Sequence, residues 1–103
     1  MRLADTFRAR AKGLLGTPNL EQGEGLLLMP CRSIHSFGMR FVFDAIYLTP
    51  KCTVLHIINH MPARRCGPVL RHASAVLELP AGTIFKSATS VYDQLVIHRE
   101  PIP

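Results

Sequence analysis

The chain has 103 residues, of which 48% are hydrophobic and 18% are charged. This length suits a single domain spanning residues 1–103, and the composition excludes a mainly disordered chain. Twelve Lys and Arg against seven Asp and Glu give a formal net charge of +5, which favours anionic partners without identifying one. The opening lacks the apolar core of a secretory signal, and no apolar run reaches the ~18 residues that span a bilayer, so we expect a cytoplasmic protein without membrane contact.

The basic side chains form two groups along the sequence. The first group is Arg2, Arg8, Arg10 and Lys12, and the second, in one predicted loop, is Arg64, Arg65, Arg71 and His72. Proteins that bind nucleic acids usually interleave such charges with aromatic rings that stack on bases. Only Phe7 lies among the first group and no aromatic residue lies among the second, so we do not expect a nucleic-acid partner.

The N-terminal part predicts one helix followed by one strand. Residues 5–16, DTFRARAKGLLG, indicate a short amphipathic helix with Asp5 as its cap and Gly16 as its stop. A polar connection follows. Residues 25–30, GLLLMP, predict a buried strand that ends at Pro30.

The remainder predicts short strands and one long loop. Residues 34–48 are rich in β-formers and indicate one bulged strand or two strands. Residues 53–58 predict the returning strand of a hairpin, and residues 59–74 predict the longest loop, a length that is uncommon unless the loop has a role. Three further strands are expected at 75–80, 81–85 and 93–98. Six to seven short strands with one N-terminal helix predict a mainly β fold, either a small barrel or a strongly curved antiparallel sheet.

The most informative segment is residues 30–48, which places a thiol, an imidazole, a guanidinium and a carboxylate in an apolar run. These groups belong to Cys31, His35, Arg40 and Asp44. Arg40 and Asp44 either pair as a structural salt bridge or leave the arginine to meet an anion. Glu78 alternates with Leu77 and Leu79 and is expected to face solvent.

The histidines and cysteines suggest zinc, but their spacing argues against it. Two Cys-x-x-x-His pairs occur, Cys31 with His35 and Cys52 with His56. Residues four apart in a strand are separated by ~13 Å, whereas zinc holds its ligands at ~2 Å, which argues against Cys52 with His56. Cys31 and His35 follow a proline in a predicted loop and could converge, but the other candidates lie in different loops and offer no second such pair. We therefore expect no metal and no cofactor. The three cysteines, in a cytoplasmic setting, are expected to be reduced.

Several segments resemble one uncharacterised family. They are GLLG at 13–16, GEGLLL at 23–28, PCRSIHSFGMRF at 30–41, the Asp44 position and VLELPAGT at 76–83. In order and spacing they resemble the bacterial and archaeal family known as domain of unknown function one-nine-two. The resemblance implies a small, mostly β, barrel-like domain and no established activity.

Three functions remain open from the sequence. We expect a non-enzymatic binding module in which residues 30–44 and the basic loop, residues 60–72, form one face for an anionic small ligand or a partner's peptide. Its expected binding residues are Cys31, His35, Arg40, Asp44, Arg64, Arg65 and Arg71. One alternative is a thiol-dependent, hydrolase-like enzyme that uses Cys31 and His35, with Asp44 orienting the imidazole. The other is a structural subunit that pairs through an exposed edge strand.

Overall fold

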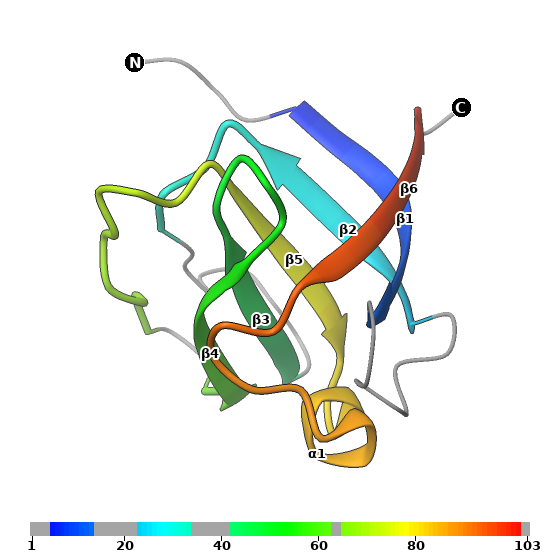
Figure 1. Ribbon diagram of the computed structural model, residues 1–103. Coiled ribbons are helices and arrows are strands. Elements are labelled where there is room, and N and C mark those ends of the chain that lie inside the picture. The colour runs from blue at the N-terminus through cyan, green and yellow to red at the C-terminus, as the bar shows by residue number, and fades with distance from the viewer. Residues whose placement is uncertain (1–4, 14–22, 34–41, 63–64, 102–103) are drawn as a thin grey trace.

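The structure is a computed structural model that describes residues 5–13, 23–33, 42–62 and 65–101. Six strands form one antiparallel sheet in the order β4-β3-β5-β2-β1-β6 (Figure 1). The elements are β1 (Asp5–Gly13), β2 (Gly23–Met29), β3 (Phe43–Leu48), β4 (Val54–Met61), β5 (Ala75–Pro80), α1 (Thr83–Ser87) and β6 (Leu95–Pro101). The predicted mainly β class is confirmed. No helix of the described residues is long and apolar enough to cross a membrane.

Four predicted strands are confirmed, one with the predicted ends and three with shifted ends. The predictions at 25–30, 53–58, 75–80 and 93–98 correspond to β2, β4, β5 and β6. β3 covers the end of the β-rich run at 34–48, and the earlier part of that run, residues 34–41, lies outside the described residues.

Strand β3 lies inside the sheet and is buried on both faces. It pairs with β4 on one side and with β5 on the other, and all six of its residues are buried. Successive side chains of a strand point to opposite faces. Ile46 and Leu48 therefore pack in one apolar cluster, and Phe43, Ala45 and Tyr47 pack in another. Asp44, the polar exception in this strand, is also fully buried.

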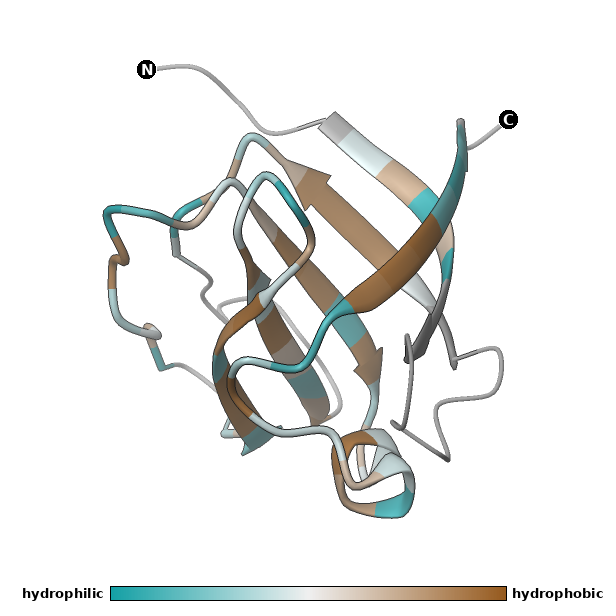
Figure 2. Ribbon diagram, in the orientation of Figure 1, coloured by the Kyte–Doolittle hydropathy of each residue, from teal (hydrophilic) through white to brown (hydrophobic). Residues whose placement is uncertain are grey.

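The two clusters lie on opposite faces of the sheet. The first cluster contains buried residues from all six strands, together with a residue of α1: Ala9, Leu27, Ile46, Leu48, Val54, Ala75, Leu77, Leu79, Ile84 and Leu95. The second contains residues from β3, β4 and β5, together with Ala73 and the partly buried Cys31 and Leu70 from irregular segments. Figure 2 shows hydrophobic residues along β2, β3, β5 and β6. Because Leu70 belongs to the basic loop, this loop helps to bury the second face of the sheet.

The predicted N-terminal helix is wrong, because residues 5–13 form strand β1. Their polarity alternates with a period of two: Phe7 and Ala9 pack inward, whereas Arg8 and Arg10 are exposed. β1 pairs with β2 and β6, so both of its edges are hydrogen bonded. The Arg99 guanidinium of β6 lies 4.8 Å from the centre of the Phe7 ring. Strand pairing on both sides prevails over a helical pattern that the same apolar residues could also satisfy.

The predicted strand at 81–85 is also wrong, because the short helix α1 forms there. Gly82 adopts φ 92°, a left-handed conformation that ends β5 and starts the helix. The Asp44 carboxylate accepts the Ile84 N–H at 2.9 Å, which supplies a cap for the first turn. Among the described residues, the one short helix therefore lies near the C-terminus.

The expected barrel or strongly curved sheet is wrong, because the sheet is open and not strongly curled. In the described part of the chain, the edge strands β4 and β6 do not pair along their lengths. One isolated bridge, Thr53 with Gln94, connects the segments that precede these strands. Beside it, the Leu95 N–H donates to the Cys52 carbonyl at 3.0 Å. The sheet meets itself at one corner, and a sustained ladder that would close a barrel is missing there.

Gly25 permits a close approach between β2 and β5. A Cβ atom at this position would lie 2.1 Å from the Glu78 carbonyl oxygen and 2.8 Å from the Leu79 Cδ2 atom. A side chain would therefore push these paired strands apart. The GEGLLL segment thus sets the spacing of the sheet centre, and Leu27 follows in the core.

Candidate functional site

The basic loop is fastened to the sheet by a buried tyrosine. Tyr47 lies on β3 with no exposed surface, and its hydroxyl donates to the Pro68 carbonyl at 2.8 Å. Its ring also contacts His56 of β4 edge to face, at a centroid distance of 5.4 Å. Since a buried tyrosine hydroxyl needs a partner, this bond holds the loop over the second face.

Three segments meet at one end of the sheet through backbone hydrogen bonds. The Leu70 N–H donates to the Arg32 carbonyl at 2.8 Å. The Cys31 N–H donates to the Ser74 carbonyl at 3.1 Å, and the Ser74 N–H donates to the Leu48 carbonyl at 2.8 Å. The segment after β2, the loop before β5 and the turn after β3 are therefore fixed side by side.

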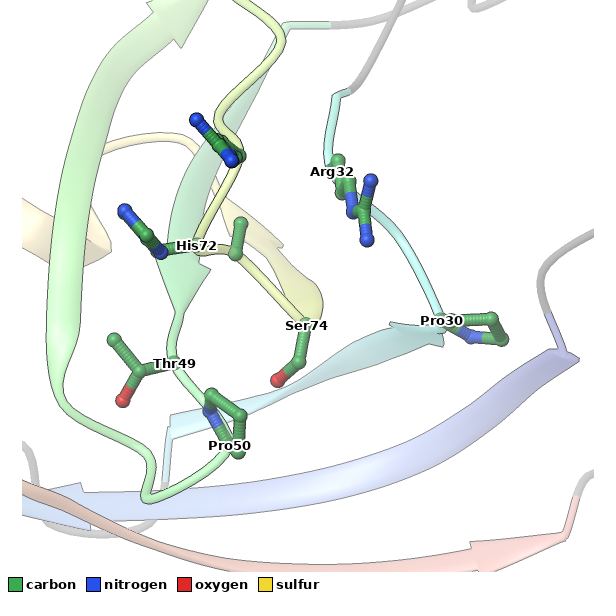
Figure 3. A pocket seen from close by; sticks show the side chains of 8 residues that line it. Pro30, Arg32, Thr49, Pro50, His72 and Ser74 are labelled. Atoms are coloured by element: carbon green, nitrogen blue, oxygen red, sulfur yellow. The ribbon is translucent and has the colours of Figure 1, made fainter.

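These segments border an open basic cavity of about 460 Å³ (Figure 3). It is lined by Pro30, Arg32, Thr49, Pro50, Arg71, His72, Ala73 and Ser74. Figure 3 shows Arg32 on the segment after β2 and His72 on the loop opposite, with Thr49 and Pro50 on the turn below. Each titratable side chain in this described lining is basic, and no carboxylate is among them. The cavity therefore presents positive charge without internal neutralisation.

The floor of the basic cavity is a well-ordered turn. The Thr49 N–H donates to the Thr53 carbonyl at 3.0 Å, and the Thr53 N–H donates back to the Thr49 hydroxyl at 3.1 Å. The Cys52 N–H donates to the Thr49 carbonyl at 2.9 Å, with Cys52 at φ 62°. Such a turn positions Thr49 and Pro50 without help from a ligand.

A smaller, mainly apolar cavity of about 190 Å³ adjoins the basic one. Its lining is Leu27, Met29, Leu48, Thr49, Pro50, Cys52, Ser74, Ala75 and Ile97. Thr49, Pro50 and Ser74 belong to both linings, so the two cavities share a wall. Leu27, Leu48 and Ala75 are members of the first apolar cluster. The smaller cavity is thus an opening at the edge of the core.

The thiol of Cys31 is in a structural setting. Cys31 is half-buried against the second cluster, and its Sγ donates to the Ser33 carbonyl at 2.8 Å. Burial raises the pKa of this thiol, the Ser33 backbone acts in the opposite direction, and the nearby Glu78 carboxylate raises it again. These surroundings favour the protonated thiol, whereas a nucleophile requires the thiolate.

The carboxylate of Asp44 connects three elements through hydrogen bonds. One of its oxygens accepts the His60 N–H at 2.9 Å, and the other accepts the Ile84 N–H at 2.9 Å. His60 has φ 52° near the end of β4, where β3 and β4 change register. Asp44 is fully buried and lines neither of the two cavities described above. It thus connects β3 to β4 and to α1.

The remaining predicted site residues are dispersed or not described. Arg71 lines the basic cavity, whereas Arg65 is exposed and lines neither cavity. His35, Arg40 and Arg64 lie outside the described residues. Glu78, expected to face solvent, is half-buried.

The structure adds Arg32 and His72 to the candidate site. Arg32 directly follows Cys31 in the segment singled out by its sequence, and His72 was counted among the basic residues of the loop. Their shared cavity depends on the Leu70 to Arg32 hydrogen bond, which joins segments far apart in the chain. Within the described residues, no group of three or more His, Cys, Asp and Glu side chains is placed to hold a metal ion.

Comparison with known proteins identifies a family. The family model DUF192, described as uncharacterized ACR, matches residues 1–97. No curated protein and no solved structure matches the chain. The match agrees with the resemblance carried by the sequence motifs and supplies no activity.

Proposed function

This chain belongs to the DUF192 family, and we propose that it is a small non-enzymatic binding module whose ligand carries an oxyanion. The ligand's carboxylate or phosphate group is held between Arg32 and Arg71 in the basic cavity. His72 provides a further nitrogen at the rim, and Thr49 and Ser74 provide hydroxyl groups on the floor.

The observation that carries this proposal is that Arg32, Arg71 and His72 line one cavity whose described lining contains no carboxylate. Arg32 and Arg71 come from separate segments that a backbone hydrogen bond holds together. A guanidinium presents planar, paired donors that match carboxylate and phosphate oxygens. The cavity volume of about 460 Å³ lies in the range of small-molecule sites, roughly 300–1,000 Å³.

A small ligand is favoured over a partner's peptide by the form of the site. Peptides commonly bind along exposed sheet edges, whereas this cavity lies between three fixed segments at one end of the sheet. The thiol-enzyme alternative is disfavoured by the raised pKa of Cys31 and by its hydrogen bond to a carbonyl.

The proposal is tested by titrating the purified protein with inorganic phosphate and with citrate while amide signals are followed by NMR. We expect saturable shifts at Arg32 and at Arg71 to Ser74, which weaken as ionic strength rises. Arg32→Gln and Arg71→Gln should each weaken binding by roughly tenfold or more, because a charged hydrogen bond contributes about 1.5–3 kcal/mol.

The matched control is Lys86→Gln. Lys86 is exposed on α1, beyond the far end of β5, so its variant removes one positive charge without touching the cavity. It should bind like the parent protein. If all three variants weaken binding equally, the effect is one of net charge, and the proposed site is wrong.

A further inference from the structure

The apolar cavity beside the basic one defines the rest of the ligand. We infer that the natural ligand is an amphipathic anion: its oxyanion meets Arg32 and Arg71, and a short alkyl chain passes along the shared wall into the apolar cavity. This inference rests on the proposed function, because the same basic cavity holds the head group.

The shared wall makes one ligand able to reach both cavities. Thr49, Pro50 and Ser74 line both, so a ligand that spans the two cavities has only these residues to pass. The wall is anchored, because the Ser74 N–H donates to the Leu48 carbonyl at 2.8 Å. A ligand with charge at one end and hydrocarbon at the other matches this order of surfaces.

The lining of the smaller cavity is suited to hydrocarbon. Leu27, Leu48 and Ala75 are buried, with exposed fractions of 3%, 1% and 4%. Met29 and Ile97 are partly buried and pack against the same cluster. In this described lining the polar groups are the Thr49 and Ser74 hydroxyls, at the shared wall, and the Cys52 thiol. Burial raises the pKa of Cys52, which keeps the lining uncharged at neutral pH.

The first experiment measures affinity for linear carboxylates from acetate to decanoate by calorimetry or NMR. Each methylene that enters the apolar cavity should tighten binding about threefold to fourfold, until the cavity is filled. Arg32→Gln and Arg71→Gln should weaken every member of the series by a similar factor.

The second experiment uses Cys52 as a reporter of occupancy. Cys52 lines the apolar cavity, whereas Cys66 is exposed and lies in neither lining. Octanoate should slow alkylation of Cys52 by iodoacetamide at least severalfold and leave Cys66 unchanged. Acetate at the same concentration should protect neither thiol. This readout uses the unaltered protein.

A variant that fills the cavity separates tail from head group. Ile97→Phe should weaken octanoate and leave phosphate binding unchanged. Val96→Phe is the matched control, because the neighbouring residue of β6 points to the other face and is not part of the lining. This control should bind both ligands like the parent.

The outcomes distinguish the two proposals. If carboxylates of every length bind equally and the arginine variants weaken all of them, the amphipathic ligand is wrong and the anion site stands. If affinity rises with chain length but does not depend on Arg32 or Arg71, the proposed anion site is wrong. Octanoate binding without protection of Cys52 also overturns the inference.

Discussion

The Leu70 N–H donates to the Arg32 carbonyl at 2.8 Å and thereby fixes the two basic segments beside each other. Leu70 also packs against the second apolar cluster, together with Cys31. The segments that form the candidate site therefore also cover the second face of the sheet. Since the same contacts bury core residues and position Arg32 and Arg71, changes to the loop anchor should affect both stability and binding.

Tyr47→Phe should loosen the basic loop while keeping the ring in the core. The hydroxyl that donates to the Pro68 carbonyl is lost, so we expect a loss of about 1 kcal/mol in the free energy of unfolding. Hydrogen exchange at the Leu70 amide should become faster, and phosphate binding should weaken. Tyr92→Phe, at a side chain that is 80% exposed, should change none of these. Unaltered exchange at Leu70 in Tyr47→Phe would contradict the anchoring role.

Asp44→Ala should be among the most destabilising single changes. It leaves the N–H groups of His60 and Ile84 without their acceptor, and the Ile84 N–H is buried, where an unsatisfied group costs about 1–3 kcal/mol. Chemical denaturation measures the loss. Asp93→Ala is the comparison, because Asp93 accepts the Ser90 N–H in an exposed turn where water can replace it. Equal losses of stability in the two variants would show that burial of the Asp44 carboxylate does not increase its contribution to stability.

Gly25→Ala should destabilise the centre of the sheet by about 1–3 kcal/mol, because the added methyl group collides with the Glu78 backbone. Hydrogen exchange should rise most in the β2 and β5 amides that pair near Leu26 and Glu78. Gly82→Asn is the control, since nothing lies within 4 Å of a Cβ atom there and asparagine tolerates positive φ. A Gly25→Ala protein as stable as Gly82→Asn would refute the close approach.

Cys31 and Cys52 should react with iodoacetamide more slowly than the exposed Cys66. Burial raises the pKa of both thiols above the usual 9.0, so their rates should reach half-maximum at higher pH than a free cysteine. Because the folded-state pKa is raised, the stability that the neutral thiols contribute is complete below pH 9 and is lost as pH rises through the folded-state pKa. Mass spectrometry of labelled peptides gives each rate. Fast labelling of Cys31 at neutral pH would support the thiol-enzyme alternative.

The purified protein should contain no stoichiometric zinc, and a chelator should leave its thermal midpoint unchanged. Among the described residues no cluster of metal-ligating side chains is formed, and Cys52 and His56 are separated by the start of β4. Elemental analysis and thermal unfolding with and without chelator provide the measurement. One equivalent of zinc that is lost, together with the fold, in Cys31→Ser would overturn this expectation.

The sequence by itself determined the mainly β class, four of the strands and the family. Short runs such as LLL at 26–28 and AVLELP at 75–80 carry their strand signal locally, through β-forming and apolar side chains bounded by glycine or proline. The wrong predictions concern segments whose local pattern fits more than one secondary structure. Phe7 and Ala9 lie on one face of a strand, and Phe7, Ala11 and Leu14 would lie on one face of a helix.

Only the tertiary structure decided between these patterns and assembled the candidate site. Residues 5–13 are a strand because β2 and β6 offer partners on both sides, and α1 is a helix because Asp44, distant in sequence, caps it. Arg32 and Arg71 share a cavity because Tyr47 and Leu70 hold the loop to the sheet. Those contacts are long-range, and the spacing of residues along a chain carries no record of which distant backbone groups will pair.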